Sequence, residues 1–354
     1  MPSGSLDLGA VEGVLRELEA ADEFSGAVGV VGGEHELFVE ALGYASRTWS
    51  VPATVETRFD TASITKLFTA VATLQLVEQG AFTLDTSAVD YLGLEETGIS
   101  PAVTAYHLLT HTSGIADDAD EEAGERYEDV FRERPNYSVL ETEDYLPQFV
   151  GKPANFAPGE GCRYCNVGYV LLGLMIERAT GSTYRDYVAE HVFARAGMDR
   201  SGFFRMDVVE PHVAEGVEPF DAGGRIGWRR NVYAYPPVGG PDGGAHVTVG
   251  DLLRFHRAVT RGRLIGPEST ADLLSPKEKH GSRGQGSHWM GFGFEFEVDA
   301  DGIVQSYWKE GVNVGVSGML RHYPLQEVTC AVLAVGENAA WGPLEAIDRA
   351  VRGS

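Results

Sequence analysis

Two Ser-x-x-Lys motifs could place a nucleophilic hydroxyl beside a base. They are Ser63/Lys66 in "DTASITKLFT" and Ser306/Lys309 in "QSYWKEG". Residues at i and i+3 share one face of a helix but point to opposite faces of a strand. Ser63 precedes apolar residues at helical spacing, whereas Ser306 lies in an alternating, strand-like stretch. The pattern favours the Ser63/Lys66 pair, with an ordinary helix cap as the alternative interpretation of Ser63.

Lysine is scarce in this chain, which gives Lys66 added weight. Of 28 basic residues only five are lysines, so arginine carries most of the positive charge. A guanidinium stays protonated, whereas a lysine can lose its proton when it is desolvated and close to another cation. The composition therefore favours proton transfer as a role for Lys66.

Two later motifs could supply partners for this pair. Tyr164-Cys165-Asn166 is the only Tyr-x-Asn in the chain and precedes an apolar helical run, and Lys309-Glu310-Gly311 is a Lys-x-Gly motif in a strand-like stretch near the C-terminus. In their order and context, the three motifs resemble those of the serine β-lactamase and penicillin-binding-protein superfamily, above all its class C and carboxylesterase branches. The stretches "HLLTHTSGI" and "GGAHVTVGDLLRFHRAV" also look like that family, and the resemblance runs from about residue 26 to 335.

The resemblance implies a role for each matching residue. Ser63 would be the nucleophile, Lys66 its base and Tyr164 a proton relay whose phenolate needs two nearby ammonium groups. In support of these three, Asn166 would orient Lys66 and a substrate carbonyl, and Lys309 would supply the second ammonium group. The backbone N–H groups of Ser63 and Val312, the residue after Gly311, would form the oxyanion hole.

One position departs from the family pattern. Lactam-processing members usually carry Thr or Ser in the middle of the third motif, where this chain has Glu310. A carboxylate there would repel an anionic substrate or pair with Lys309. We therefore expect a neutral or cationic substrate, unless Glu310 points away from the site.

The elements that must position these residues can be read from periodicity. We expect helices over 6–21, 64–79, 167–180 and 344–351, a shorter one within 105–115, and an antiparallel hairpin around Gly32-Gly33. The acidic run 117–129 is expected to be a solvated, mobile flap that could close over the site.

The fold class follows from strands at both ends of the chain and helices between them. We expect an α+β, β-lactamase/transpeptidase-like fold in which an antiparallel sheet is flanked by helices, with an inserted and mostly helical domain. Residues 1–60 and 285–354 would form the first domain, and residues 61–284 the helical domain that carries the Ser-x-x-Lys and Tyr-x-Asn motifs.

Composition narrows the choice of partners. A net charge of −24 argues against nucleic acid and anionic membranes. We expect a small-molecule ester or amide as partner, no membrane association and a cytoplasmic location, because the N-terminus has no signal-peptide pattern and three cysteines do not form a disulfide framework. The oligomeric state is left open.

Two patterns of cysteine and histidine could suggest a metal site, but structural roles for these residues are the simpler interpretation. Cys162-x-x-Cys165 has no second pair, and His107 and His111 lie in a stretch that matches a structural segment of the family. We therefore expect neither a metal nor a cofactor.

The function indicated is a serine hydrolase that forms an acyl-enzyme, most simply an esterase or amidase. An acyltransferase of the same fold, a β-lactamase or D,D-carboxypeptidase, and a catalytically silent binding or scaffold protein are the alternatives. The last of these would be expected to have lost a motif residue, and Ser63, Lys66, Tyr164 and Lys309 are all present.

Overall fold

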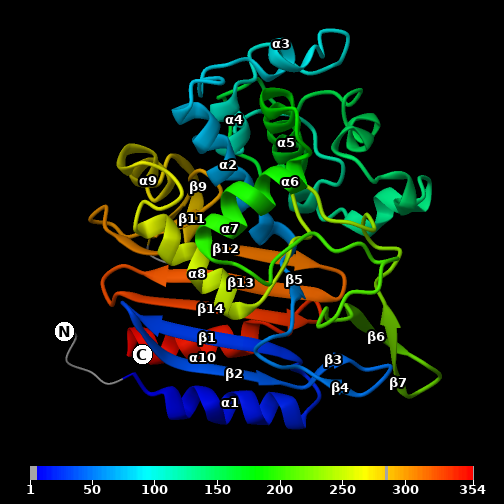
Figure 1. The fold of residues 1–354 in the computed structure, drawn as a ribbon, viewed down its shortest axis with the longest axis vertical. Coiled ribbons are helices and arrows are strands. Elements are labelled where there is room, and N and C mark those ends of the chain that lie inside the picture. The colour runs from blue at the N-terminus through cyan, green and yellow to red at the C-terminus, as the bar shows by residue number, and fades with distance from the viewer. Residues whose placement is uncertain (1–5, 284–285, 354) are drawn as a thin grey trace.

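The computed structural model describes residues 6–283 and 286–353, and its centre is an eight-stranded antiparallel sheet (Figure 1). The strands run in the order β2-β1-β14-β13-β12-β11-β10-β9. Their bounds are β1 (Gly26–Gly32), β2 (His35–Leu42), β9 (Glu278–Arg283), β10 (Gly286–Met290), β11 (Glu295–Val298), β12 (Val304–Asn313), β13 (Val316–Tyr323) and β14 (Val328–Val335).

Helices cover both faces of this sheet. The longer ones are α1 (Leu8–Ala20), α2 (Lys66–Glu78), α5 (Asn166–Thr180), α8 (Val249–Thr260) and α10 (Trp341–Arg352). The shorter ones are α3 (Ala88–Leu92), α4 (Ala105–Leu109), α6 (Tyr184–Val188), α7 (Ala194–Ala196) and α9 (Pro267–Leu273). There are also 3-10 segments, η1 (Ala62–Thr65), η2 (Glu121–Ala123), η3 (Tyr127–Arg132), η4 (Asn136–Ser138) and η5 (Thr142–Gln148), and a π-helical segment, η6 (Ala189–Phe193).

Three strand pairs lie outside the main sheet. They are β3 (Tyr44–Ser46) with β4 (Val51–Pro52), β5 (Phe59–Asp60) with β8 (His246–Val247), and β6 (Val217–Asp221) with β7 (Ile226–Arg230). The β5/β8 pair matters most for the site, because η1 and α2 begin directly after β5.

Side chains of the central strands alternate between two cores, one on each face of the sheet. Along β1, Val28 and Val30 pack into the core beneath α1 and α10, whereas Ala27 and Val31 pack into the larger core with α2, α5 and α8. Side chains of a strand point alternately to opposite faces, so a strand buried on both sides must be apolar throughout. This confirms the predicted α+β class with an antiparallel sheet flanked by helices.

Most of the predicted elements form close to their expected bounds. The helix expected over 6–21 is α1, the hairpin around Gly32-Gly33 is β1 and β2, and the last two expected helices are α5 and α10. The helix expected within 105–115 is shorter than that range, because it ends at Leu109 and His111 adopts a positive φ of 60°.

The two predicted domains are closely joined. In Figure 1 the helices α2 to α6 lie beyond one side of the sheet, as expected for a helical region within 61–284. Two elements of that range nevertheless belong with the sheet: β9 is its edge strand, and α8 packs against β1 and β14. The division at 60 and 285 stays a prediction. No helix within the described residues has both the length and the apolar character that a bilayer crossing requires.

Candidate active site

Ser63 lies in the short turn η1, between β5 and the first residue of α2. The cap positions of η1 and α2 are Thr61 and Thr65, and neither makes a side-chain capping hydrogen bond. Ala62, directly before Ser63, has a φ of 41°, a conformation that costs a non-glycine residue on the order of 1–2 kcal/mol. Ser63 is therefore held in a tight turn before the helix, and the interpretation as a helix cap is wrong.

Lys66 is fully buried and directs its ammonium group at Ser63. Its Nζ donates to Ser63 Oγ at 3.1 Å, to Asn166 Oδ1 at 2.7 Å and to the backbone carbonyl of Asp242 at 2.6 Å. Burial lowers the pKa of Lys66 from 10.5 to about 8, with a further lowering from Lys309. The expected desolvation of Lys66 is therefore present, and a useful fraction of the amine is neutral near neutral pH.

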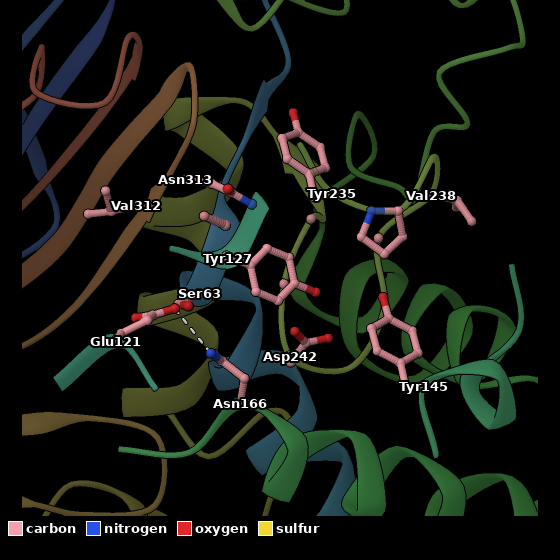
Figure 2. Close-up of a pocket in the computed structure, with 15 residues that line it drawn as sticks. Ser63, Glu121, Tyr127, Tyr145, Asn166, Tyr235, Val238, Asp242, Val312 and Asn313 are labelled. Atoms are coloured by element: carbon pink, nitrogen blue, oxygen red, sulfur yellow. Dashed lines mark hydrogen bonds between the residues drawn. The ribbon is translucent and has the colours of Figure 1, made fainter. Parts of the chain in front are cut away.

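Asn166 orients Lys66 and lies at the cavity beside Ser63. Its Oδ1 accepts from Lys66, and its Nδ2 donates to Glu121 Oε1 at 3.1 Å, the contact drawn in Figure 2. An amide nitrogen has two N–H donors, so a contact between the second one and a substrate carbonyl stays a prediction.

The acidic run 117–129 is part of the site wall and not only a solvated flap. Asp117 and Asp118 are buried, and the Asp117 carboxylate accepts the backbone N–H groups of Asn166 and Val167 at 2.7 and 2.9 Å. These are orphan donors at the start of α5, whose own cap residue, Cys165, makes no side-chain capping bond. Asp117 therefore ties the acidic run to the helix that carries Asn166.

Tyr164 stands between the two lysines as a neutral phenol. The Nζ atoms of Lys309 and Lys66 lie 4.5 and 5.1 Å from its ring centroid, and its hydroxyl shares a hydrogen bond with Ser63. Burial, followed by the charge of Glu121, raises the pKa of Tyr164 well above its ordinary value. Tyr164 therefore rests as the neutral phenol, and both ammonium groups are near enough to stabilise the transient phenolate that the predicted relay requires.

Lys309 has a carboxylate partner that the sequence did not indicate. Its Nζ donates to Glu295 Oε1 at 2.8 Å, and Lys309 lowers the pKa of this carboxyl against the effect of burial. Glu310, which sequence proximity suggested as the partner of Lys309, is exposed and lines a cavity together with Lys309 and Glu295. The second Ser-x-x-Lys motif is indeed a decoy, because Ser306 Oγ donates to Glu297 instead.

Gly311 lets β12 approach the turn of Ser63. A Cβ at this position would lie 2.0 Å from Thr61 O and 3.1 Å from Ser63 N. The strand β11 pairs with β12 only as far as Trp308, so residues 309–313 continue beyond its end. Val312 thus sits beside Ser63 at the open edge of the sheet, where the predicted oxyanion hole would be.

Two cavities meet at this point, and both are lined by Ser63, Val312 and Glu121. The first is shown in Figure 2 and has an aromatic wall of Tyr127, Tyr145 and Tyr235. The second, called the polar cavity below, is lined also by Tyr164, Glu122, His280, His288, Glu295, Lys309 and Glu310.

Four residues of the site were missed: Asp242, Glu121, Glu295 and His111. The ring of His111 stacks on Tyr164 at 4.6 Å, and its Nδ1 accepts from the backbone N–H of Cys165. Only His111 could have been noticed in the sequence as a site residue, because it belongs to the stretch "HLLTHTSGI", which resembles the family. The three carboxylates lie in segments with no motif.

The histidine and cysteine patterns are occupied by internal contacts. His107 Nδ1 takes part in the capping box of α4 with Thr104, and the sulfurs of Cys162 and Cys165 lie near different backbone carbonyls. Within residues 6–283 and 286–353, no group of three or more His, Cys, Asp or Glu side chains has the arrangement of a metal site.

Taken with the fold, a serine hydroxyl bonded to a buried lysine defines the class of serine hydrolases that use a Ser-Lys pair. The family model described as Beta-lactamase matches residues 11–350, so the chain belongs to that family. It is a serine hydrolase enzyme of this fold.

Individual relatives agree with this assignment. The chain is 30% identical to esterase EstB of Burkholderia gladioli, over 76% of this chain and 74% of that protein. It is 28% identical to penicillin-binding protein 4* of Bacillus subtilis (strain 168) over 72% of its own length, but spans only 56% of that longer protein. A crystal structure of a penicillin-binding protein from Bacillus halodurans matches with a TM-score of 0.88 and 35% identity, covering 96% of this chain and 99% of that one.

Proposed function

We propose that this protein hydrolyses small esters or amides through an acyl-enzyme on Ser63, with substrates that are neutral or cationic. The observation that carries the proposal is the 3.1 Å contact between Ser63 Oγ and the buried Lys66 Nζ, at a point where two cavities open. A neutral amine in this position can remove the serine proton as the hydroxyl attacks. The Burkholderia gladioli relative, named an esterase, supports the choice of ester.

Acylation would use Lys66 as base and Tyr164 as acid. Lys66 accepts the proton of Ser63 Oγ while a bond forms from this oxygen to the carbonyl carbon, and the N–H groups of Ser63 and Val312 stabilise the resulting oxyanion. Tyr164 donates its phenolic proton to the leaving group as the carbonyl–leaving-group bond breaks. The transient phenolate lies beside both ammonium groups and recovers a proton from Lys66.

Deacylation would repeat these transfers with water. Lys66 is again neutral, so it can accept a proton from a water molecule that attacks the acyl carbon, with Tyr164 as relay. Ser63 Oγ leaves and takes back a proton, which frees the acid product and restores the resting enzyme. The same residues thus serve both halves of the reaction.

The charge of the site supports the choice of substrate. Lys309, the cation that could bind a substrate carboxylate, is bonded to Glu295, and the polar cavity also carries Glu122 and Glu310. An anionic group that approached Lys309 there would meet the buried Glu295 carboxylate, whose repulsion is strong because little solvent screens it, and the weaker fields of the exposed Glu122 and Glu310. This disfavours a β-lactamase or D,D-carboxypeptidase, whose substrates carry a carboxylate.

Short-chain p-nitrophenyl ester hydrolysis by the wild type, by Ser63→Ala and by Lys66→Ala tests the proposal. We expect the wild type to be active and each variant to lose roughly 10⁴-fold or more in kcat. A chromogenic cephalosporin should be turned over far more slowly than the ester, and added methanol would divert product to the methyl ester if acyl transfer competes. Equal ester rates in wild type and Ser63→Ala, or fast cephalosporin turnover, would contradict the proposal.

A further inference from the structure

The aromatic cavity holds a buried carboxylate oxygen that lacks a hydrogen-bond partner. Asp242 is 7% exposed and lines this cavity, and within the described residues no hydrogen bond reaches its Oδ1. In Figure 2 its carboxylate lies among the side chains of Tyr127, Tyr145 and Asn166. Burying a carboxylate oxygen without a partner is costly, so this arrangement calls for a compensating group.

Lys66 cannot satisfy this oxygen while it serves Ser63. An ammonium group has three donors, and those of Lys66 reach Ser63 Oγ, Asn166 Oδ1 and the backbone carbonyl of Asp242. The Asp242 side chain is therefore close to the base yet outside its hydrogen bonds. Burial raises the pKa of Asp242, and the nearby charge of Lys66 offsets only part of this effect.

The surroundings of Asp242 suit an organic cation. Three tyrosines, Tyr127, Tyr145 and Tyr235, line the same cavity, and aromatic faces attract ammonium groups that have left water. Burial raises the pKa of each of these phenols well above its ordinary value, so none is a competing anion. The cavity thus offers a buried carboxylate oxygen within an aromatic wall, whereas Glu121, its other carboxylate, is exposed and accepts from Asn166.

The position of Tyr164 decides which part of the substrate enters this cavity. Tyr164, which would protonate the leaving group, lines the polar cavity and not the aromatic one. The leaving group should therefore depart through the polar cavity, and the acyl group should occupy the aromatic cavity on the other side of Ser63.

We propose that Asp242 binds a primary ammonium group on the acyl part of the substrate, close to the scissile carbonyl. The preferred substrates are then aminoacyl esters or amides with a free amino group. This inference rests on the proposed function for its direction, because it takes Ser63 as nucleophile and Tyr164 as acid. A short acyl chain is required, since Ser63 Oγ and the Asp242 carbonyl contact the same lysine nitrogen.

A pair of isosteric esters tests the inference. The p-nitrophenyl ester of β-alanine differs from that of butyrate by an ammonium in place of a methyl group. We expect the wild type to favour the β-alanine ester in kcat/KM, and Asp242→Asn to lower this preference by about ten- to a hundred-fold, the value of a charged hydrogen bond. Comparing the ratio removes any effect of the variant on both esters alike.

Glu310→Gln is the matched control, because it removes one negative charge from the other cavity. Glu310 is exposed and its field is screened, so the ratio should change by less than about twofold. An unchanged ratio in Asp242→Asn, or an equal fall in Glu310→Gln, would overturn the assignment to Asp242.

A binding measurement keeps the two proposals separable. Benzylammonium should bind the wild type by calorimetry more tightly than benzyl alcohol, and Asp242→Asn should abolish the difference. If neither ester is hydrolysed but benzylammonium binds in this way, the proposed function fails and the Asp242 site stands. If butyrate ester is hydrolysed but benzylammonium has no advantage, the hydrolase stands and the Asp242 site is wrong.

Discussion

Substituting Gly311 by alanine should disable the enzyme without changing a functional group. The new Cβ would lie 2.0 Å from Thr61 O, 3.0 Å from Thr61 C and 3.1 Å from Ser63 N. Real carbon atoms essentially never approach closer than 3.0 Å, so β12 and the Ser63 turn must separate by about 1 Å or more. A displacement of this size at the reacting atoms costs roughly 10²-fold.

The assay is kcat/KM for a p-nitrophenyl ester, with Gly281→Ala as control. Gly281 lies in β9 of the same sheet, and a Cβ there meets no atom within 4 Å. We expect Gly311→Ala to lose about 10²-fold and Gly281→Ala to stay within about twofold of the wild type. Circular dichroism and active-site titration should show that the lost activity does not come from unfolded protein. A folded Gly311→Ala enzyme with near wild-type activity would refute the reasoning.

Two further predictions concern the base and the acidic run. Since Lys66 accepts a proton only as the neutral amine, and its pKa is lowered to about 8, kcat/KM should rise about tenfold per pH unit up to pH 8 and then level. Tyr164→Phe should lower the rate but keep this rise of kcat/KM with pH, because the raised pKa of Tyr164 leaves its phenol protonated over that range. If the rise disappeared in Tyr164→Phe, Tyr164 would be the base. Asp117→Ala removes two capping acceptors of α5, so urea unfolding should show a loss of about 1–2 kcal/mol, whereas Asp129→Ala, in the exposed part of the run, should be neutral.

Local patterns were enough to predict which side chains the structure brings together around Ser63. Ser63 and Lys66 are three positions apart and Tyr164 and Asn166 are two apart, so each pair is held by its own short segment. Helical spacing separated Ser63 from the decoy Ser306, and the structure agrees. Long-range packing brings these short segments together in the fold. The order of the three motifs along the chain indicated that they would meet.

The partner of Lys309 could not be predicted in this way. Sequence proximity drew attention to Glu310, but successive side chains of a strand point to opposite faces, so an immediate neighbour is poorly placed to pair with Lys309. Glu295 is the first residue of β11, far from Lys309 in sequence, and its register partner is Trp308, directly before Lys309. Its carboxylate accepts from Lys309 Nζ at 2.8 Å. Register between strands depends on the whole sheet, and a single sequence does not specify it.

The acidic run misled for a related reason. A charge run is usually solvated, and this holds for Glu121 to Glu125, which are exposed. Asp117 and Asp118 are buried instead, because the start of α5 needs an acceptor that its own residues do not supply. Composition shows how many charges a segment has, but not which distant backbone groups require them.

The carboxylates around Lys66 give the site its particular balance. Burial and Lys309 lower the pKa of Lys66, whereas Asp242, Glu121 and Asp117 raise it. A base works best when its pKa lies near the working pH, so neither influence alone would be suitable.

If a substrate ammonium occupies Asp242, it cancels the largest of the charges that raise the pKa of Lys66, and it adds a cation beside Lys66. The pKa of Lys66 must then fall, so the preferred substrate would increase the neutral fraction of the base that attacks it. The rising limb of kcat for the β-alanine ester should accordingly lie at lower pH than that for the butyrate ester, and coincident limbs would show that no ammonium sits beside Asp242 during the reaction.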